Sequence, residues 1–406
     1  MGCIKRFVTL SINMKSVDYV KDVGQIPYVL HKKYGYESAV AGYQVESEYL
    51  KQEVKGLRTE VVKRYKRNFF NFLPVLLLFL GDYATYSGVR YLLKNAKRID
   101  VLNIYHIHNP HMPFWILAYK WLNPRGIVYL KLDIPKYLYE EYKEYLYGKH
   151  KFPHYHFRSR FACKVAGNTR KCDIVSVESH ELVELVANLL KREVLYIPNG
   201  LYNRKAVDGN LKENIIMCAA NLEMPIKQID VLMEAFTRID PAIGNEWTLI
   251  LAGAYGKRFK QIYDKFCVDY PDVADKVILT GEIINRNELM NLYEKAKIFV
   301  LPSKTENFSL AALEALGNGD FAILSDGVTS KDDLMDRDGM GFIIKSGDVK
   351  DCTEKLEKAI KFLQDKDASF YEEISSHTLM RFSWEEILKT LNEKINQVGI
   401  NEYKNC

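Results

Sequence analysis

The sequence of 406 residues predicts an α/β protein of two tandem domains that face each other across a cleft. Strand-like and helix-like segments alternate along the chain, the pattern typical of mostly parallel sheets covered by helices. The alternation stops near residues 198–200 and then restarts. The charge also changes there, because residues 1–200 hold 31 Lys and Arg against 18 Asp and Glu, whereas residues 201–406 hold 26 against 34. A basic and an acidic half indicate domains with different partners.

The first half is expected to form one sheet with its helices. Pro198-Asn199-Gly200 interrupts the pattern, and the polar stretch 204–214 reads as a linker. The expected domains are residues 1–195, residues 196–384, and a terminal helix over 385–406 that packs back towards the N-terminal domain. The predicted strands are 7–12, 38–41, 100–108, 127–132, 173–177 and 194–197, and the predicted helices are 26–33 and 181–190.

The second half repeats the same alternation. Ligands in such folds bind beyond the carboxyl ends of the strands, so the main site is expected in the cleft between the two units. The predicted strands are 215–219, 247–251, 276–279, 298–301 and 321–325, and the predicted helices are 229–239, 259–270, 287–296, 309–316, 350–363 and 384–397.

Several classes of protein are disfavoured by what the sequence lacks. Its seven cysteines include no C-x-x-C pair, which argues against a disulfide framework and a zinc ribbon and favours the reducing cytoplasm. No G-x-G-x-x-G follows a predicted strand, and no P-loop occurs, so a dehydrogenase or a P-loop enzyme is not expected. No nucleic-acid-binding module is recognisable, and no nucleic acid is expected as a partner.

Residues 63–80 combine a basic run with an apolar run. Residues 63–67 carry four cationic side chains, and the apolar stretch 69–80 is too short to span a membrane. Such a segment can anchor a protein peripherally on anionic lipid, here at the inner face of the cytoplasmic membrane. The alternative is a buried core helix with a solvated basic cap.

The most informative stretch runs from Leu301 to Gly319 and reads as strand, loop, short helix and glycine stop. Asn307 or Ser309 can cap the helix, and Gly317 suits its C-terminal end. Glu306 lies before the helix and Glu314 within it. The helix N-terminus suits a diphosphate, and the two carboxylates suit sugar and ribose hydroxyls, a combination that describes a nucleotide sugar. The alternative is an ordinary capped helix with a solvated glutamate.

These residues resemble a known family. The E-x7-E pair, with Pro302-Ser303 before it and Leu313–Gly317 around its second member, resembles the donor signature of retaining glycosyltransferases of family 4. The resemblance implies the GT-B fold, two tandem Rossmann-like domains facing across a cleft. Further segments resemble the family in the same order, namely Ile197–Gly200, the stretch NLEMPIKQID from Asn221 to Asp230, Leu251–Gly253, Val277–Gly281 and Phe382–Trp384.

The resemblance assigns roles to the matching positions. Lys227 would contact the donor diphosphate, Glu306 the hydroxyls of the donor sugar, and Glu314 the ribose. It also implies retention of configuration, a UDP- or GDP-sugar as the donor substrate, and no required cofactor or metal. The remaining donor-site positions are Asn307, Phe308, Ser309 and Leu310 at the helix start, Glu282 and Ile283 at the base, Asn221, and Gly24 as a remnant of the family's glycine loop.

Two positions depart from the family pattern. Asn221 stands where the family often carries Arg, so Lys257 or Arg258 is considered as a replacement cation. Leu132 stands where a His is common, although Asp133 remains. His106 and His108 end a predicted strand and are candidates for the missing contact, together with Asp133 on the acceptor side, and His108 is the candidate for catalysis. The alternative is that both are structural histidines.

The sequence therefore predicts an enzyme that moves a sugar from a nucleotide sugar to a glycan or lipid-linked acceptor, in the synthesis of a cell-surface polysaccharide or glycolipid. Two alternatives stay open. One is a catalytically inactive relative that serves as an interaction subunit, which the changes at positions 132 and 221 favour. The other is a nucleotide-sugar epimerase on the same fold, which would need acid and base groups that we do not find.

Overall fold

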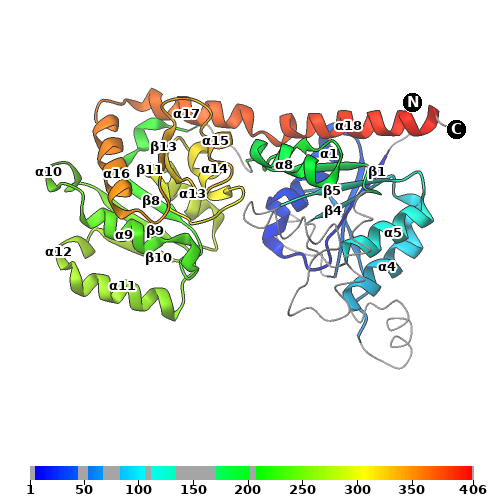
Figure 1. Ribbon diagram of the computed structural model, residues 1–406, viewed down its shortest axis with the longest axis horizontal. Helices are drawn as coiled ribbons and strands as arrows, with labels where there is room; N and C mark the ends of the chain where they lie inside the picture. The colour runs from blue at the N-terminus through cyan, green and yellow to red at the C-terminus, as the bar shows by residue number, and fades with distance from the viewer. Residues whose placement is uncertain are drawn as a thin grey trace. The chain divides into compact units, whose positions relative to one another are not determined.

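The computed structural model describes residues 5–43, 54–66, 83–105, 111–133, 171–201 and 207–404. It divides into two compact units, the first formed by residues 1–202 with 383–406 and the second by residues 203–382 (Figure 1). Among the described residues, no helix is both long and apolar enough to cross a membrane. Residues 67–80 of the basic and apolar segment, and His106 and His108, lie outside the described residues.

Unit 1 is built on a parallel seven-stranded sheet in the order β3-β2-β1-β4-β5-β6-β7. The central strands β4, β5 and β6 are buried throughout, as expected of a sheet covered on both faces, whereas the edge strands β3 and β7 are partly exposed. The strands are β1 (Arg6–Leu10), β2 (Glu37–Gly42), β3 (Arg58–Val61), β4 (Val101–Tyr105), β5 (Ile127–Lys131), β6 (Ile174–Val177) and β7 (Leu195–Tyr196).

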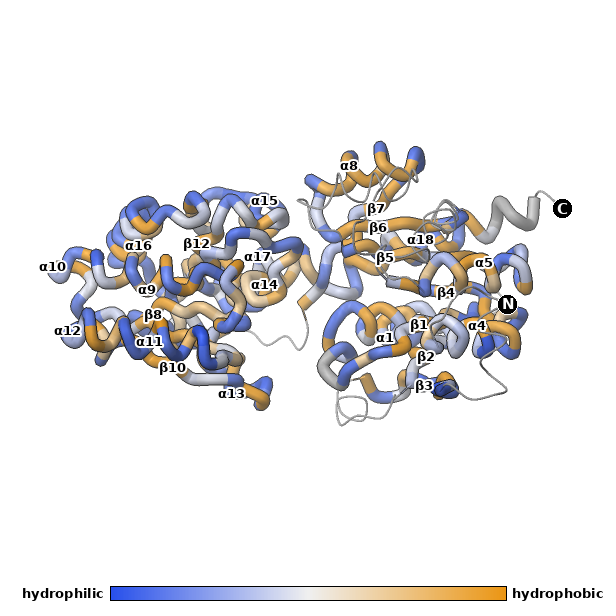
Figure 2. Tube along the Cα trace, turned by 60° about the horizontal axis from the view of Figure 1, so that its bottom comes forward, coloured by the Kyte–Doolittle hydropathy of each residue, from blue (hydrophilic) through white to orange (hydrophobic). Residues whose placement is uncertain are grey.

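The helices of unit 1 bury one apolar face each. In Figure 2, α8 alternates between hydrophobic and hydrophilic segments, and its buried residues include Leu182, Val186 and Leu189. The C-terminal helix α18 lies beside α1, where Tyr36 donates a hydrogen bond of 2.9 Å to Asn392. The α-helices are α1 (Asp22–Tyr34), α4 (Tyr83–Asn95), α5 (Met112–Leu122), α8 (His180–Leu190) and α18 (Trp384–Lys404), and the 3-10 helices are η1 (Ser16–Val20) and η2 (Ala96–Arg98).

Unit 2 is built on a parallel six-stranded sheet in the order β10-β9-β8-β11-β12-β13. This is the strand order of a dinucleotide-binding fold, and the order reverses between β8 and β11. The reversal matters because ligands in such sheets bind at this switch point, beyond the carboxyl ends of the strands. The strands are β8 (Glu213–Ala219), β9 (Thr248–Ala252), β10 (Val277–Gly281), β11 (Ala296–Leu301), β12 (Phe321–Ser325) and β13 (Gly341–Ile344).

Helices cover the second sheet as well, and α9 packs against α16 while α14 packs against α17. The α-helices are α9 (Ile229–Thr237), α10 (Pro241–Gly244), α11 (Lys257–Asp269), α12 (Pro271–Ala274), α13 (Arg286–Lys295), α14 (Leu310–Gly317), α15 (Lys331–Leu334), α16 (Val349–Leu363) and α17 (Ala368–Arg381), and the 3-10 helices are η5 (Gly209–Leu211) and η6 (Pro225–Lys227).

Two expectations about local structure were wrong. The polar stretch 204–214 is not a linker throughout, because η5 lies within it and β8 already begins at Glu213. The helix after the donor loop does not stop before Gly317, which is its last residue. The left-handed conformation that ends the turn falls on Gly319, whose φ is 85°. Sequence patterns locate elements better than their ends, since several nearby glycines can end a helix.

Candidate functional site

The switch point of unit 2 brings two loops together. One loop follows β8 and ends in η6, and the other follows β11 and leads into α14. The backbone N–H of Lys304 donates a hydrogen bond of 2.7 Å to the carbonyl of Ile226, which ties the loops directly. Residues far apart in sequence, around 227 and around 306, are therefore held at one place beyond the sheet.

Lys227 and Glu306 meet at this place. The Lys227 ammonium forms an ion pair with Oε2 of Glu306. The side chains are 16% and 23% exposed, so both remain accessible to a ligand. The sequence predicted a contact of each with the donor, and the structure brings them together across 79 positions of sequence. A carboxylate accepts several hydrogen bonds, so this ion pair leaves acceptor capacity for hydroxyl groups.

The chain around Glu306 is fixed by backbone hydrogen bonds. Its N–H donates to the carbonyl of Gly327 at 3.0 Å, and its carbonyl accepts from Thr329 at 2.9 Å. The carbonyl of Asn307 accepts from Ser330 at 3.1 Å. These bonds attach the donor loop to the segment after β12, so the position of the Glu306 carboxylate does not depend on its own loop alone.

Ser309 caps α14, which decides between the two predicted capping residues. Its hydroxyl oxygen accepts a hydrogen bond of 3.1 Å from the N–H of Ala312. Phe308 is buried and packs edge-to-face on Phe382, with ring centroids 6.1 Å apart. Leu310 begins the helix. The buried Phe308 anchors the start of α14, whose first backbone N–H groups and positive dipole end favour an anion.

Glu314 is also paired, with a residue that the sequence analysis did not single out. Arg286, the first residue of α13, forms an ion pair with Oε1 of Glu314 on α14. Arg286 follows closely after Glu282 and Ile283, which lie just beyond β10 where the resemblance expects the base. The available signal was a cation directly before the predicted helix over 287–296.

The proposed replacement cations differ in what they do. The Arg258 guanidinium donates to the carbonyls of Glu223 and Leu222, at 2.9 and 3.4 Å. It therefore braces the loop after β8, while Lys257 is exposed at the start of α11. Asn221 is exposed, and its side-chain oxygen accepts from the N–H of Glu223 at 3.2 Å. Hydrogen bonds from the N–H groups of Phe259, Gly256 and Arg258 lower the pKa of the Glu223 carboxyl.

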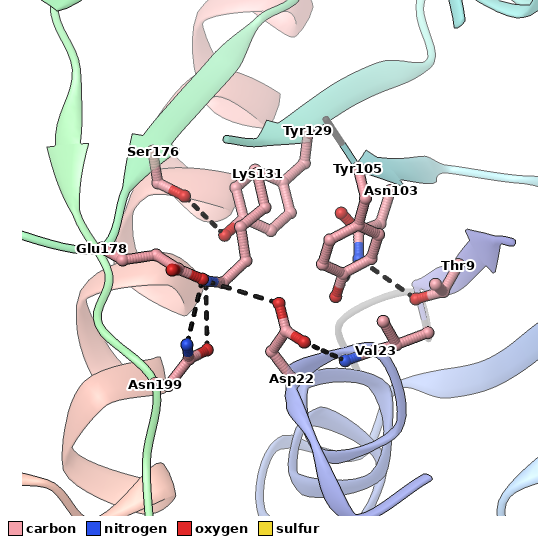
Figure 3. Close-up of polar contacts among 10 residues, drawn as sticks. All are labelled: Thr9, Asp22, Val23, Asn103, Tyr105, Tyr129, Lys131, Ser176, Glu178 and Asn199. Atoms are coloured by element: carbon pink, nitrogen blue, oxygen red, sulfur yellow. Dashed lines mark hydrogen bonds and ion pairs between the residues drawn. The ribbon is translucent and has the colours of Figure 1, made fainter. Parts of the chain in front are cut away.

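Unit 1 carries a buried charged cluster at the same edge of its own sheet (Figure 3). Lys131, the last residue of β5, is 1% exposed, and its ammonium lies 2.5 Å from Oε1 of Glu178. It also lies 3.4 Å from Oδ2 of Asp22 and 3.3 Å from the side-chain oxygen of Asn199. Sequence analysis missed Lys131, although a lysine that ends an otherwise apolar strand is a detectable signal.

Ionisation in this cluster follows from burial and from the neighbouring charges. Burial raises the pKa of Glu178 to about 7, an effect that Lys131 opposes and that Asp133 and Asp22 reinforce. Burial lowers the pKa of Lys131, but Glu178 and Asp22 raise it by more, and the net direction is upward. The ammonium therefore stays charged among more carboxylates than it can neutralise.

The other positions predicted in unit 1 are placed as follows. Leu132 is fully buried in the core, so the family's histidine position contributes no polar group here. Asp133 is partly exposed. Gly24 lies inside α1, where an added Cβ would come within 2.4 Å of the Tyr19 backbone. Gly24 therefore allows α1 to pack closely against η1 and does not belong to an open loop.

The part of the chain that the structure describes holds no group of three or more His, Cys, Asp or Glu that could bind a metal ion. What the unit 2 arrangement can do chemically is bind a diphosphate between Lys227 and the start of α14, with carboxylates on either side for hydroxyl groups.

Comparisons with known proteins show what family and what fold the chain resembles. Residues 202–374 match the family described as Glycosyl transferases group 1. The serotype-specific mannosyltransferase WbdA of Escherichia coli is 28% identical over 178 residues, which are 43% of this chain and 21% of WbdA. The chain thus spans about a fifth of the length of the curated relatives it matches.

Solved structures share the fold over nearly the whole chain. Anabaena HepE in complex with UDP has a TM-score of 0.67 at 14% identity, covering 97% of this chain and 100% of HepE. The catalytic domain of starch synthase IV from Arabidopsis thaliana, bound to ADP and acarbose, has a TM-score of 0.70 at 12% identity, covering 98% and 100%. The predicted fold class, two Rossmann-like domains of the GT-B type, is confirmed, and so is the resemblance to group 1 glycosyltransferases.

Proposed function

We propose that this chain, whose residues 202–374 match the group 1 glycosyltransferases, is a retaining glycosyltransferase of family 4 that uses a UDP- or GDP-sugar. The observation that carries the proposal is the pairing of Lys227 with Glu306 at the switch point between β8 and β11. A diphosphate needs a cation, and a sugar needs hydroxyl acceptors, and this pair offers both at one place.

In the proposed reaction the bond between the anomeric carbon and the diphosphate breaks, and a bond from the acceptor oxygen to that carbon forms on the same face. The acceptor proton passes to the departing phosphate oxygen. Lys227 and the start of α14 stabilise the charge that develops on the leaving group. Glu306 orients the sugar through its hydroxyls. The proposed reaction needs neither an enzyme nucleophile nor a metal ion.

The acceptor is proposed to be a glycan or lipid-linked glycan, and the pathway the synthesis of a cell-surface polysaccharide or glycolipid. The naming of a relative as a serotype-specific mannosyltransferase supports this direction. Unit 1 is proposed to bind the acceptor, with Asp133, His106 and His108 as contacts and His108 in catalysis. The proposed place of action is the cytoplasmic face of the membrane, contacted through residues 63–80.

The test is a thermal-shift screen of the purified chain against UDP-, GDP-, ADP- and dTDP-sugars, first without metal and then with Mg²⁺. A nucleotide at about 100 times its dissociation constant should add nearly 3 kcal/mol to the free energy of unfolding. Stabilisation by one nucleotide class without metal supports the proposal. Stabilisation by none contradicts it and favours the inactive relative, for which the next search would be for a protein partner.

A further inference from the structure

The ion pair between Arg286 and Glu314 is unlike a contact that mainly stabilises the fold. Arg286 is the first residue of α13, and a cation at a helix N-terminus is disfavoured by the helix dipole. The two side chains are 26% and 16% exposed, and an ion pair that water still reaches contributes only modestly to stability. An arginine in this position therefore calls for another role.

The helix α13 is held in place without this pair. Its N-cap residue Asn285 accepts a hydrogen bond of 3.0 Å from the N–H of Asn287. Tyr293 is fully buried and packs against Phe299, with ring centroids 6.0 Å apart. The fold thus positions Arg286 by other contacts, and the guanidinium is then available to orient its partner.

We propose that Arg286 is a positioning residue, which holds the Glu314 carboxylate in place for the ribose of the donor and so makes the site select ribonucleotides over 2′-deoxyribonucleotides. The inference rests on the proposed function, in which Glu314 binds the ribose. Arginine stays charged at every relevant pH, and its rigid fork fixes a carboxylate better than a lysine does. A carboxylate held in one rotamer loses less side-chain entropy when a hydroxyl donates to it.

The buried side chain of Tyr293 beside the partly exposed pair strengthens this effect. Burial raises the pKa of Tyr293, and Glu314 raises it further whereas Arg286 lowers it, so both charges act on the same buried phenol. Hydrogen bonds in partly desolvated surroundings are stronger than in water, and an acceptor left without its donor costs more. A nucleotide that lacks the 2′-hydroxyl should therefore bind roughly tenfold more weakly than the ribonucleotide.

The experiment measures the dissociation constants of UDP and 2′-deoxy-UDP, and of the GDP and 2′-deoxy-GDP pair, by calorimetry on the full chain. In Arg286→Gln the ribonucleotide should bind roughly tenfold more weakly, the deoxynucleotide about as before, and the ratio should approach one. Arg286→Lys should recover part of the ratio. With a donor sugar, KM should rise while kcat stays near its native value.

Arg238→Gln is the matched control, because Arg238 forms an exposed pair with Glu234 on α9 and lies outside the proposed site. Its ratio should equal that of the native chain. A native ratio retained in Arg286→Gln, or in Arg286→Lys if the first variant does not fold, would overturn the inference. The inference would also be overturned if the native chain bound the ribonucleotide and the 2′-deoxyribonucleotide equally well. Binding of neither nucleotide pair by the native chain would overturn the proposed function and this inference together.

Discussion

The carboxyl edges of the two sheets can be compared directly, because each sheet carries charged residues there. In unit 2, Lys227 and Arg286 each pair with one glutamate and remain 16% and 26% exposed. In unit 1, Lys131 pairs with Glu178 and Asp22 and is 1% exposed. The same edge of the same type of sheet is thus accessible in one unit and sealed in the other.

The difference in burial indicates which ion pairs can bind a ligand and which ones stabilise the fold. A partly exposed ion pair can exchange its partner for a ligand at small cost, since water already screens it. A sealed pair cannot lose a member without leaving a charge in a desolvated place. The unit 2 pairs are therefore expected to control activity, and the Lys131 cluster is expected to control the stability of unit 1.

The largest effect is expected at Glu306. Glu306→Ala should lower turnover by roughly a thousandfold, because in the proposed function it removes the hydroxyl acceptor beside the reacting carbon. The variant should keep its native melting temperature within a few degrees, as the pair with Lys227 is partly exposed. Steady-state kinetics and thermal unfolding measure the two effects. Near-native turnover of the Glu306→Ala variant would contradict the assignment of Glu306 to the donor site.

The reverse result is expected at Lys131. Lys131→Met should lower the free energy of unfolding by about 3–5 kcal/mol, because the buried Glu178 and the partly buried Asp22 would lose their cation. Urea unfolding measures this loss, and Lys227→Met is the matched variant in unit 2, for which a smaller loss is expected. Equal losses in the two variants would contradict the comparison.

Both units should lose stability as the pH rises, because burial raises the pKa of Glu178 in unit 1 and of Asp320 in unit 2 to about 7. The pKa of Glu178 is raised from 4.5 to about 7, so the folded chain binds more protons than the unfolded chain between these values. The contribution of Glu178 to stability is fully present below pH 4.5 and is lost as the pH rises through about 7. Unfolding of Glu178→Gln, followed from pH 4.5 to 7, should show a smaller decline than the native chain, because the part contributed by Asp320 remains. If the stability of the native chain and that of the variant changed with pH in parallel, Glu178 would not be a cause of the decline.

The smallest effect concerns the membrane. Lys63, Arg64 and Lys66 are exposed, and their replacement by Gln should reduce sedimentation with anionic vesicles by a few-fold at low salt. Substituting Lys260, Lys265 and Lys350, which are exposed in unit 2, provides a control of equal charge change. Unchanged sedimentation of the first variant would favour the core interpretation of residues 63–80.

Local sequence determined most of the fold. Alternating apolar runs placed β1, β5, β8, β11 and β12 to within about one residue at most ends, because buried parallel strands read as continuous apolar segments. The short helix after β11 also follows from residues 301–319 alone, whereas the structure was needed to choose Ser309 over Asn307 as its cap. The strand β13 and the helix α17 were missed, because their patterns are short or weakly amphipathic.

The partners of the charged residues came only from the tertiary structure. The sequence around Glu314 does not predict its contact with Arg286, which lies 28 positions away. The sequence around Lys131 likewise does not predict its contact with Asn199, 68 positions away. Strand order sets these neighbours, because parallel strands bring distant loops to one edge of a sheet. The sequence by itself therefore predicted the fold class, which is confirmed, and the residues proposed to bind a nucleotide sugar, whereas long-range packing decided which charges are exposed and which are buried.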